Sequence, residues 1–306
     1  MVAINVLAFS HAGSMTRFGG ERSTPGPGEL GWGQRMSVLL SGPTVARPVN
    51  VRTPGAVGLP FSTQRVRVDE ATELETWWVP HADPRGVVVL CHGYAASKTA
   101  LLDAARGFYD QGFSCLLVGF RGSGGSTGNV TTLGYHEAGD VAAAVALAQR
   151  LAPEDPVVLY GVSMGAAAAL RAVHVEGVAP DALIVEAPFD RLLTTVRNRF
   201  ALMGAPSFPA ADVLVFWGSV RRDMDGFAHN PVDYARTVTC PTLVLHGALD
   251  DRVSVSEVTA VHAAVASERK WLHVFPDLGH ESYVAARPEA WGARVSEFLA
   301  TALAQR

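Results

Sequence analysis

The sequence predicts an α/β fold, with a mostly parallel, eight-stranded sheet flanked by helices. Apolar, β-branched runs alternate with helical segments from residue 65 to residue 303, as repeated βαβ units require. Apolar residues make up 48% of the chain and charged residues 18%, so a large core is expected and disorder is not. A chain of 306 residues can form one domain that buries roughly three quarters of its unfolded surface.

The first two strands are expected near an edge of the sheet, at 65–69 and 74–79. The next run, GVVVLCH at 86–92, is continuously apolar, which is typical of a strand buried on both faces. Further strands are expected at 114–118, 156–160, 182–185, 242–245 and 271–274. Helices are expected between and after them, at 97–110, 133–151, 164–173, 255–266 and 288–303. Apolar residues at near-helical spacing support the first of these helices, and Pro153 ends the second.

Two segments stand outside this alternation. Residues 1–60 are predicted to be an N-terminal extension packed on a domain at 61–306, with short helices at 1–18 and 34–40. About fifty residues, at about 190–240, separate two strands, which is too long for a structureless loop in a compact domain. This insertion carries apolar and aromatic residues and is predicted to be a helical lid or cap. A surface excursion that covers part of the core is the alternative.

One pentapeptide carries a chemical signal, Gly161-Val162-Ser163-Met164-Gly165. The G-x-S-x-G pattern alone is weak, because the chain contains 30 glycines. Its context strengthens it, because a predicted strand ends at the first glycine and a predicted helix starts directly after the serine. The helix N-terminus also favours developing negative charge. Ser163 is therefore the predicted nucleophile, and a small residue in a tight turn is the alternative.

A serine nucleophile needs a base and an acid that orients the base. His280 follows the last predicted strand, and the adjacent Asp250 and Asp251 follow the strand before it. Both loops lie beyond the carboxyl ends of strands, where ligands bind in open α/β sheets. His280 is the predicted base and Asp250 the predicted acid, with Asp251 as the alternative. The backbone N–H groups of Tyr94 and Met164 are predicted to form the oxyanion hole.

Other ionisable residues near the predicted strand ends have other expected roles. Glu186 is predicted to form an ion pair with Arg121, although binding of a substrate amine is an alternative. Glu137 is predicted to support the start of its helix. His92 and His246 are expected to fix loop geometry through hydrogen bonds. No group of histidines has the spacing of a zinc site, and no metal or organic cofactor is expected.

Five motifs together resemble the α/β-hydrolase superfamily over about residues 61–306: HGYAAS, GFRGSGGSTG, GVSMG, HGALDDRV and the final Gly-His. Within it, the chain is most similar to bacterial esterases and lysophospholipase-like hydrolases, related to serine aminopeptidases and prolyl-oligopeptidase-type catalytic domains. The resemblance implies a Ser-Asp-His triad, and its spacing favours Asp250 over Asp251 as the acid. Two positions depart from the family pattern. Gly119 replaces an aspartate and Ala187 replaces a serine, and both changes are expected to reshape the pocket.

The predicted function is a serine hydrolase that cleaves carboxylic esters with short-to-medium acyl chains, with a monoacylglycerol or lysophospholipid among the possible substrates. An aminopeptidase or acyl-peptide hydrolase that uses the same triad is the first alternative. It requires an anionic site for the substrate amine, for which Glu186 is the candidate. A catalytically silent fold used for binding is the second alternative.

Charge and composition limit the expected partners. The net charge of −4 provides no basic surface for nucleic acid or for a membrane, and no stretch approaches the ~20 apolar residues of a spanning helix. The N-terminus lacks a positive charge before its apolar run, unlike a signal peptide. Cys91, Cys115 and Cys240 are expected to be reduced and inert. A cytoplasmic protein with a small-molecule ester substrate is expected, and Trp217 with its apolar neighbours makes a homodimer possible.

Overall fold

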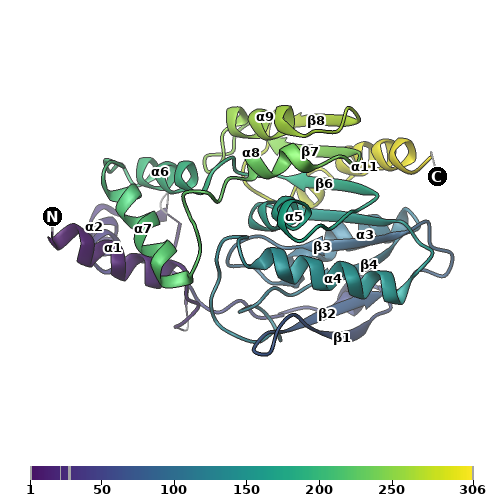
Figure 1. Cartoon of the computed structure of the whole chain (residues 1–306), viewed down its shortest axis with the longest axis horizontal. Coiled ribbons are helices and arrows are strands. Elements are labelled where there is room, and N and C mark those ends of the chain that lie inside the picture. Colours follow the sequence, from purple (N-terminus) through teal and green to yellow (C-terminus); the bar gives the residue numbers. More distant parts are fainter. Residues whose placement is uncertain (1, 21, 27–28, 305–306) are drawn as a thin grey trace.

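The structure is a computed structural model that describes residues 2–20, 22–26 and 29–304. Its eight-stranded sheet has the order β1-β2-β4-β3-β5-β6-β7-β8 (Figure 1). The strands are β1 (Ser62–Arg67), β2 (Glu73–Val79), β3 (Val87–Cys91), β4 (Ser114–Val118), β5 (Val157–Val162), β6 (Ala182–Glu186), β7 (Thr242–Gly247) and β8 (Lys270–Phe275). β2 is antiparallel to both of its neighbours, and all other neighbours are parallel. The predicted mostly parallel sheet is therefore confirmed.

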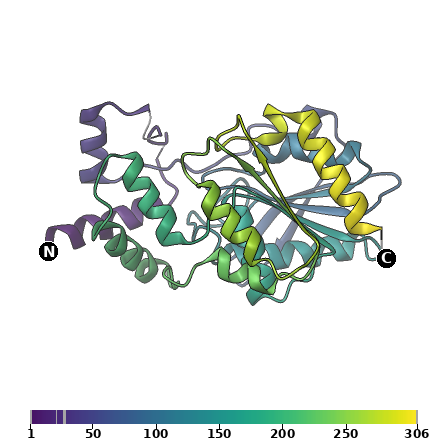
Figure 2. The same cartoon turned by 90° about the horizontal axis from the view of Figure 1, so that it is seen from above.

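Helices cover both faces of the sheet because its central strands are apolar on both sides. Every residue of β3 is buried, and alternate residues join two different core clusters. Val89 belongs to a core cluster that includes residues of α4 (Glu137–Leu151), α5 (Met164–Val175) and α9 (Val255–Ala264) on one face. Leu90 belongs to a second cluster that includes residues of α3 (Leu102–Asp110), α10 (Tyr283–Ala286) and α11 (Pro288–Leu303) on the other face, and Figure 2 shows α11 crossing that face.

Helix α4 begins four residues later than the sequence analysis expected, at Glu137 instead of Leu133. The buried Glu137 carboxylate accepts hydrogen bonds from the Thr132 N–H, at 2.9 Å, and from the Gly134 N–H, at 3.0 Å. These bonds hold the preceding residues in a turn, and Leu133 has a positive φ of 57°. A residue in that conformation cannot belong to a right-handed helix. Glu137 therefore organises the turn that precedes α4.

A second group of helices lies beyond one end of the sheet. It consists of α1 (Val2–Met15), α2 (Trp32–Ser41), α6 (Leu192–Leu202) and α7 (Ala210–Arg222), which both views show together (Figures 1 and 2). The insertion between β6 and β7 also contains a short helix, α8 (Pro231–Tyr234), which packs against α5 and α9. The N-terminal segment thus lies against helices of the insertion, with α1 packed along α7.

The contact between α1 and α7 covers the aromatic residue that the sequence analysis considered for a dimer interface. The Trp217 indole N–H donates to Asn5 Oδ1 at 3.0 Å, and the Phe9 ring meets the Trp217 ring edge-on at 5.2 Å. Ala8 and Ala12 complete a small apolar cluster between the two helices. The chain therefore covers Trp217 with its own first helix, while Phe216 and Val220 on α7 remain exposed.

The structure shows the state of the three cysteines and whether any described helix could span a membrane. Cys91 and Cys115 are buried, Cys240 is half-buried, and all three are free thiols. Burial raises the pKa of each thiol, and that of Cys240 reaches about 11, so all three stay protonated at neutral pH. Among the residues described, no helix combines the length and apolar character needed to span a membrane.

Candidate active site

Ser163 lies on the sharp turn that joins β5 to α5. Its backbone has φ 53° and ψ −112°, a conformation that residues with side chains rarely adopt. The Ser163 N–H donates to the Glu186 carbonyl at 2.8 Å, which ties the turn to β6. A Cβ on Gly161 would lie 2.5 Å from the Gly165 carbonyl oxygen, and a Cβ on Gly165 would overlap the carbonyl of Cys91. Both glycines of the motif are therefore required for the turn to form.

His280 and Asp250 lie beside this serine in one hydrogen-bonded chain. His280 Nε2 is 3.2 Å from Ser163 Oγ, and His280 Nδ1 is 2.6 Å from Asp250 Oδ2. The parallel strands β5, β7 and β8 end at the same edge of the sheet, which brings the loops after them together. His280 is thus within hydrogen-bonding distance of both the predicted nucleophile and the predicted acid.

Asp250 is held as a carboxylate, and its neighbour Asp251 points elsewhere. Asp250 Oδ1 accepts the N–H groups of Arg252 and Val253 at 2.8 and 3.0 Å. Burial opposes the charge, but the bond to His280 and these N–H groups keep the pKa of Asp250 below its ordinary value. Asp251 is exposed and makes no side-chain hydrogen bond to any described residue. The geometry therefore selects Asp250 from the pair.

The loop after β3 carries the predicted oxyanion donor Tyr94. A Cβ on Gly93 would lie 3.6 Å from Ser163 Cβ, so the backbone of this loop runs directly beside the serine. Met164 is the first residue of α5, where the N–H has no partner within the helix. Neither the Tyr94 nor the Met164 N–H donates to another described residue. Both N–H groups are therefore available to an oxygen bound at this site.

His92 and His246 lie beside these loops and differ in their hydrogen bonding. The His92 ring bridges the Gly93 carbonyl, at 2.9 Å, and the Phe120 N–H, at 3.2 Å, so it holds the loop after β3 as expected. Burial lowers the pKa of His92 to about 4, so its ring is neutral. The expectation for His246 was wrong, because neither ring nitrogen makes a hydrogen bond to a described residue. Its Nδ1 is 4.0 Å from Asp250 Oδ2, and the ring packs against that carboxylate.

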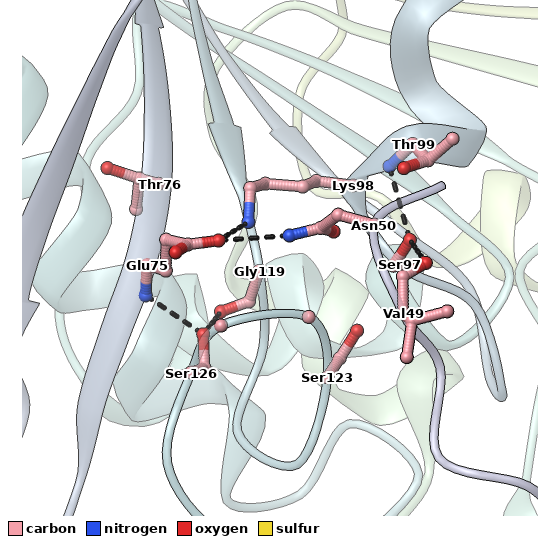
Figure 3. Close-up of polar contacts among 12 residues, drawn as sticks. Val49, Asn50, Glu75, Thr76, Ser97, Lys98, Thr99, Gly119, Ser123 and Ser126 are labelled. Atoms are coloured by element: carbon pink, nitrogen blue, oxygen red, sulfur yellow. Dashed lines mark hydrogen bonds and ion pairs between the residues drawn. The ribbon is translucent and has the colours of Figure 1, made fainter. Parts of the chain in front are cut away.

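A buried lysine anchors the far end of the same loop (Figure 3). Lys98 is fully buried, and its Nζ lies 2.6 Å from Glu75 Oε1 and 4.4 Å from the centre of the Trp77 ring. Asn50 donates to the same Glu75 oxygen at 2.9 Å (Figure 3). A Cβ on Gly119 would lie 2.8 Å from the Glu75 carbonyl oxygen and 3.3 Å from Lys98 Nζ. The glycine that departs from the family pattern thus makes room for a lysine that links the loop to the N-terminal segment.

A cavity of about 230 Å³ opens beside Ser163. Its inner part is lined by buried residues of α3, β5, β6 and α10, among them Ala104, Tyr160, Glu186 and Tyr283. Its outer part is lined by more exposed residues, among them Arg199, Arg252, Glu281 and Ser282. No group of three or more His, Cys, Asp and Glu residues able to hold a metal ion occurs within residues 2–20, 22–26 and 29–304.

The predicted ion pair between Glu186 and Arg121 is wrong. Arg121 instead forms a multiple contact with Asp140 on α4, with a shortest distance of 2.6 Å. Glu186 lies on the wall of the cavity, where it accepts the indole N–H of Trp291 at 2.6 Å and a bond from the Tyr160 hydroxyl. Burial raises the pKa of Glu186 to about 7, although these two bonds oppose the rise.

Two lining residues had little or no signal in the sequence. Arg252 follows directly after Asp250 and Asp251 in the motif HGALDDRV. The motif predicts that this loop lies at the site, but it does not predict that the Arg252 side chain lines the cavity. Arg199 lies within α6 of the insertion, far along the chain from every motif. Its place in the cavity wall follows from how the insertion folds back over the sheet edge.

The fold and the comparisons with known proteins both support a hydrolase. The family described as serine aminopeptidase, S33, matches residues 82–232. A monoacylglycerol lipase of Mycolicibacterium smegmatis is 28% identical over 67% of this chain and 85% of its own length. An uncharacterised protein of Mycobacterium tuberculosis is 28% identical over 75% of this chain and 74% of its own.

Among solved structures, the Pyrococcus furiosus esterase Pf2001 has the same fold. It superposes with a TM-score of 0.70 at 23% identity, over 84% of this chain and 98% of that one. The chain therefore has the α/β-hydrolase fold, and the family match and the similarity to a monoacylglycerol lipase support an α/β-hydrolase of the esterase and lipase type. The predicted resemblance is confirmed.

Proposed function

We propose that this protein is a serine hydrolase of carboxylic esters, with Ser163 as nucleophile, His280 as base and Asp250 as the acid that orients the base. The observation that supports this most directly is the continuous chain Ser163 Oγ–His280–Asp250, with separations of 3.2 and 2.6 Å. A serine hydroxyl is a weak nucleophile until a neutral imidazole takes its proton. The Asp250 carboxylate holds the imidazole tautomer that carries its proton on Nδ1, so Nε2 is free to accept.

The reaction proceeds in two stages. Ser163 Oγ attacks the ester carbonyl as His280 Nε2 takes its proton, and the N–H groups of Tyr94 and Met164 stabilise the oxyanion. The bond to the alcohol breaks as His280 returns the proton to the leaving oxygen, which gives an acyl-enzyme. Water then attacks this acyl-enzyme with the same histidine as base, and the carboxylic acid leaves. The scheme uses residues of this chain and water alone.

The cavity supports a short-to-medium acyl group without sharp selection of its length. Its inner lining is largely apolar, and one methylene in such a pocket changes binding by only ~1–3 kcal/mol. We also propose that the insertion at 190–240 acts as a cap, because its helix α6 supplies Arg199 to the cavity wall. An ester that is cleaved at one chain length and refused at the next would argue against this description of the pocket.

The first experiment is hydrolysis of p-nitrophenyl esters from acetate to palmitate by the wild type and by Ser163→Ala. We expect activity that disappears in the variant, together with covalent labelling of the wild type by a fluorophosphonate. Ser296→Ala is a matched control, because Ser296 is exposed on α11 and does not line the cavity beside Ser163. Equal activity in the wild type and Ser163→Ala would refute the assignment of the nucleophile.

An aminopeptidase that uses the same triad needs an anionic group to bind the substrate ammonium. Glu186 is the candidate, but its carboxylate is already bonded to Trp291 and is partly protonated at neutral pH, because burial raises its pKa to about 7. Such a group binds a cation weakly, so the ester reaction is preferred. A panel of aminoacyl anilides beside the ester panel separates the two, and faster cleavage of the anilides would reverse the preference.

A further inference from the structure

Two arginines line the outer part of the cavity that contains Ser163. Arg199 comes from α6 of the insertion, and Arg252 comes from the loop after β7. Arg199 is half-buried and Arg252 is exposed, whereas Tyr160 and Glu186 on the inner lining are 1% and 2% exposed. The two cations therefore lie at the open end of the cavity. An ester bound across Ser163 would have one of its ends beside them.

Neither guanidinium is paired. Within the described part of the chain, Arg199 and Arg252 make no side-chain hydrogen bond, and no carboxylate oxygen lies within 4.0 Å of either. By contrast, Arg197 lies two residues before Arg199 on the same helix and pairs with Asp212 at 3.1 Å. The helix thus has one arginine, Arg197, that pairs with a carboxylate of α7, and one, Arg199, that lines the cavity without a partner.

The surroundings make this arrangement unfavourable without an anion. Burial lowers the pKa of Arg199 and the nearby Arg252 lowers it further, and these effects outweigh the opposing effects of Tyr94, Asp251 and Asp250. Glu281 also lines the cavity, but it is exposed and accepts a main-chain N–H two residues before it. A partly desolvated cation beside a like charge costs free energy that a bound anion would offset. Unpaired arginines at a cavity with a nucleophile are typical of recognition of an anionic group.

We propose that Arg199 and Arg252 bind an anionic oxoacid group, a carboxylate or a phosphate, on the alcohol side of the substrate ester. The proposal rests on the proposed ester hydrolysis at Ser163 and names its substrate class. The planar guanidinium presents paired N–H donors that match the oxygens of either group. The anionic group is bound and is not itself changed in the reaction.

The order of the two stages places the anion on the alcohol rather than on the acyl group. The alcohol must leave while the acyl group is still bonded to Ser163, and water must then reach the acyl carbon. An alcohol at the open end of the cavity can leave past an acyl chain that stays in the inner part. With the opposite placement, the bound acyl group would block the exit of the alcohol. The arginines at the open end therefore face the alcohol.

The test compares pairs of esters that are alike except for one anionic group. One pair is hexanoyl glycerol and hexanoyl glycerol 3-phosphate, and the other is propyl hexanoate and the hexanoate ester of 3-hydroxypropanoate. We expect the charged member to be cleaved with a higher kcat/KM by about 10- to 100-fold, the range expected for charge-assisted hydrogen bonds. Arg199→Gln and Arg252→Gln should each lose most of this preference, because each should lower kcat/KM for the charged ester by a much larger factor than for the neutral ester.

Control variants separate binding of the anion from a general loss of structure. Arg197→Gln removes a charge from the same helix outside the cavity and should keep the full preference. Arg199→Lys keeps a charge but not the paired donors, so it should retain part of the preference. A preference for phosphate alone or carboxylate alone would identify which oxoacid the arginines bind. Equal cleavage of charged and neutral esters by the wild type, or an equal loss on both in Arg199→Gln, would overturn the proposal.

The outcome also distinguishes this proposal from the one on which it rests. If the wild type cleaves neutral esters, Ser163→Ala does not, and charge has no effect, the ester hydrolase stands and the anion site fails. If Ser163→Ala cleaves every ester as well as the wild type, the nucleophile assignment fails first. Glycerol 3-phosphate, compared with glycerol as an inhibitor of neutral-ester cleavage, gives a binding readout that does not need turnover of a charged substrate.

Discussion

Glu186 makes the stability of the protein depend on pH. Its side chain is buried between Trp291 and Tyr160, with no cation within 4.0 Å among the described residues, and burial raises its pKa from an ordinary 4.5 to about 7. Between these two values the folded protein holds a proton that the unfolded chain has released. The stability that this protonated carboxyl contributes is thus fully present below pH 4.5 and is lost as the pH rises through 7. A glutamine at position 186 can still accept the indole N–H but does not titrate.

We therefore expect the wild type to lose about 2 to 3 kcal/mol of stability relative to Glu186→Gln between pH 5 and pH 8, from the size of the shift and 1.36 kcal/mol per unit. The measurement is urea unfolding of both proteins at pH 5, 6, 7 and 8, followed by circular dichroism and tryptophan fluorescence. Exposed Glu154 offers the control Glu154→Gln, whose pH dependence should follow that of the wild type. A difference between the wild type and Glu186→Gln that stays constant over this range would refute the reasoning.

Three further predictions concern the turn, the acid and the buried lysine. Asp250→Asn should lower kcat by about 10⁴, because the imidazole loses its correct tautomer, while Asp251→Asn should stay within a few-fold of the wild type in the same ester assay. The reverse result would assign the acid to Asp251. Gly165→Ala should destabilise the protein by more than about 4 kcal/mol or prevent soluble expression, because its Cβ would overlap the end of β3, and a normal melting temperature would contradict this. Lys98→Met should cost about 3 to 5 kcal/mol in urea unfolding by leaving Glu75 without its buried partner, and Lys98→Met combined with Glu75→Leu should recover part of the loss. An equal loss in the single and the double variant would show that the ion pair is not the cause.

The sheet and the positions of Ser163, Asp250 and His280 could be predicted because their signals are local. Each strand is an apolar run, and each of the three residues lies just beyond such a run in its own motif. Parallel strands bring the ends of those runs to one edge, so local patterns imply a shared site. The predicted start of α4, at Leu133, is four residues too early. The alanine-rich composition predicts a helix, but it does not show that the Glu137 carboxylate accepts hydrogen bonds from the turn before it.

The contacts of Glu186 and Trp217 could not be predicted, because their partners come from distant parts of the chain. Trp291 reaches Glu186 from α11, more than a hundred residues later, and nothing near either residue marks the contact. Arg121, the partner expected from charge alone, lies next to the start of α4 and is taken by Asp140. Opposite charges indicate which residues can pair, but the topology of the sheet decides which residues meet.

The unpaired Arg199 differs from the other charged residues near this site. Most buried or half-buried charges that the sequence places near this site find a partner in the fold: Lys98 has Glu75, Arg121 has Asp140, and Asp250 has His280. Arg199 has none among the described residues, although Arg197 beside it is paired. Because these other charges have partners within the fold, we infer that the anionic partner of Arg199 is part of the substrate.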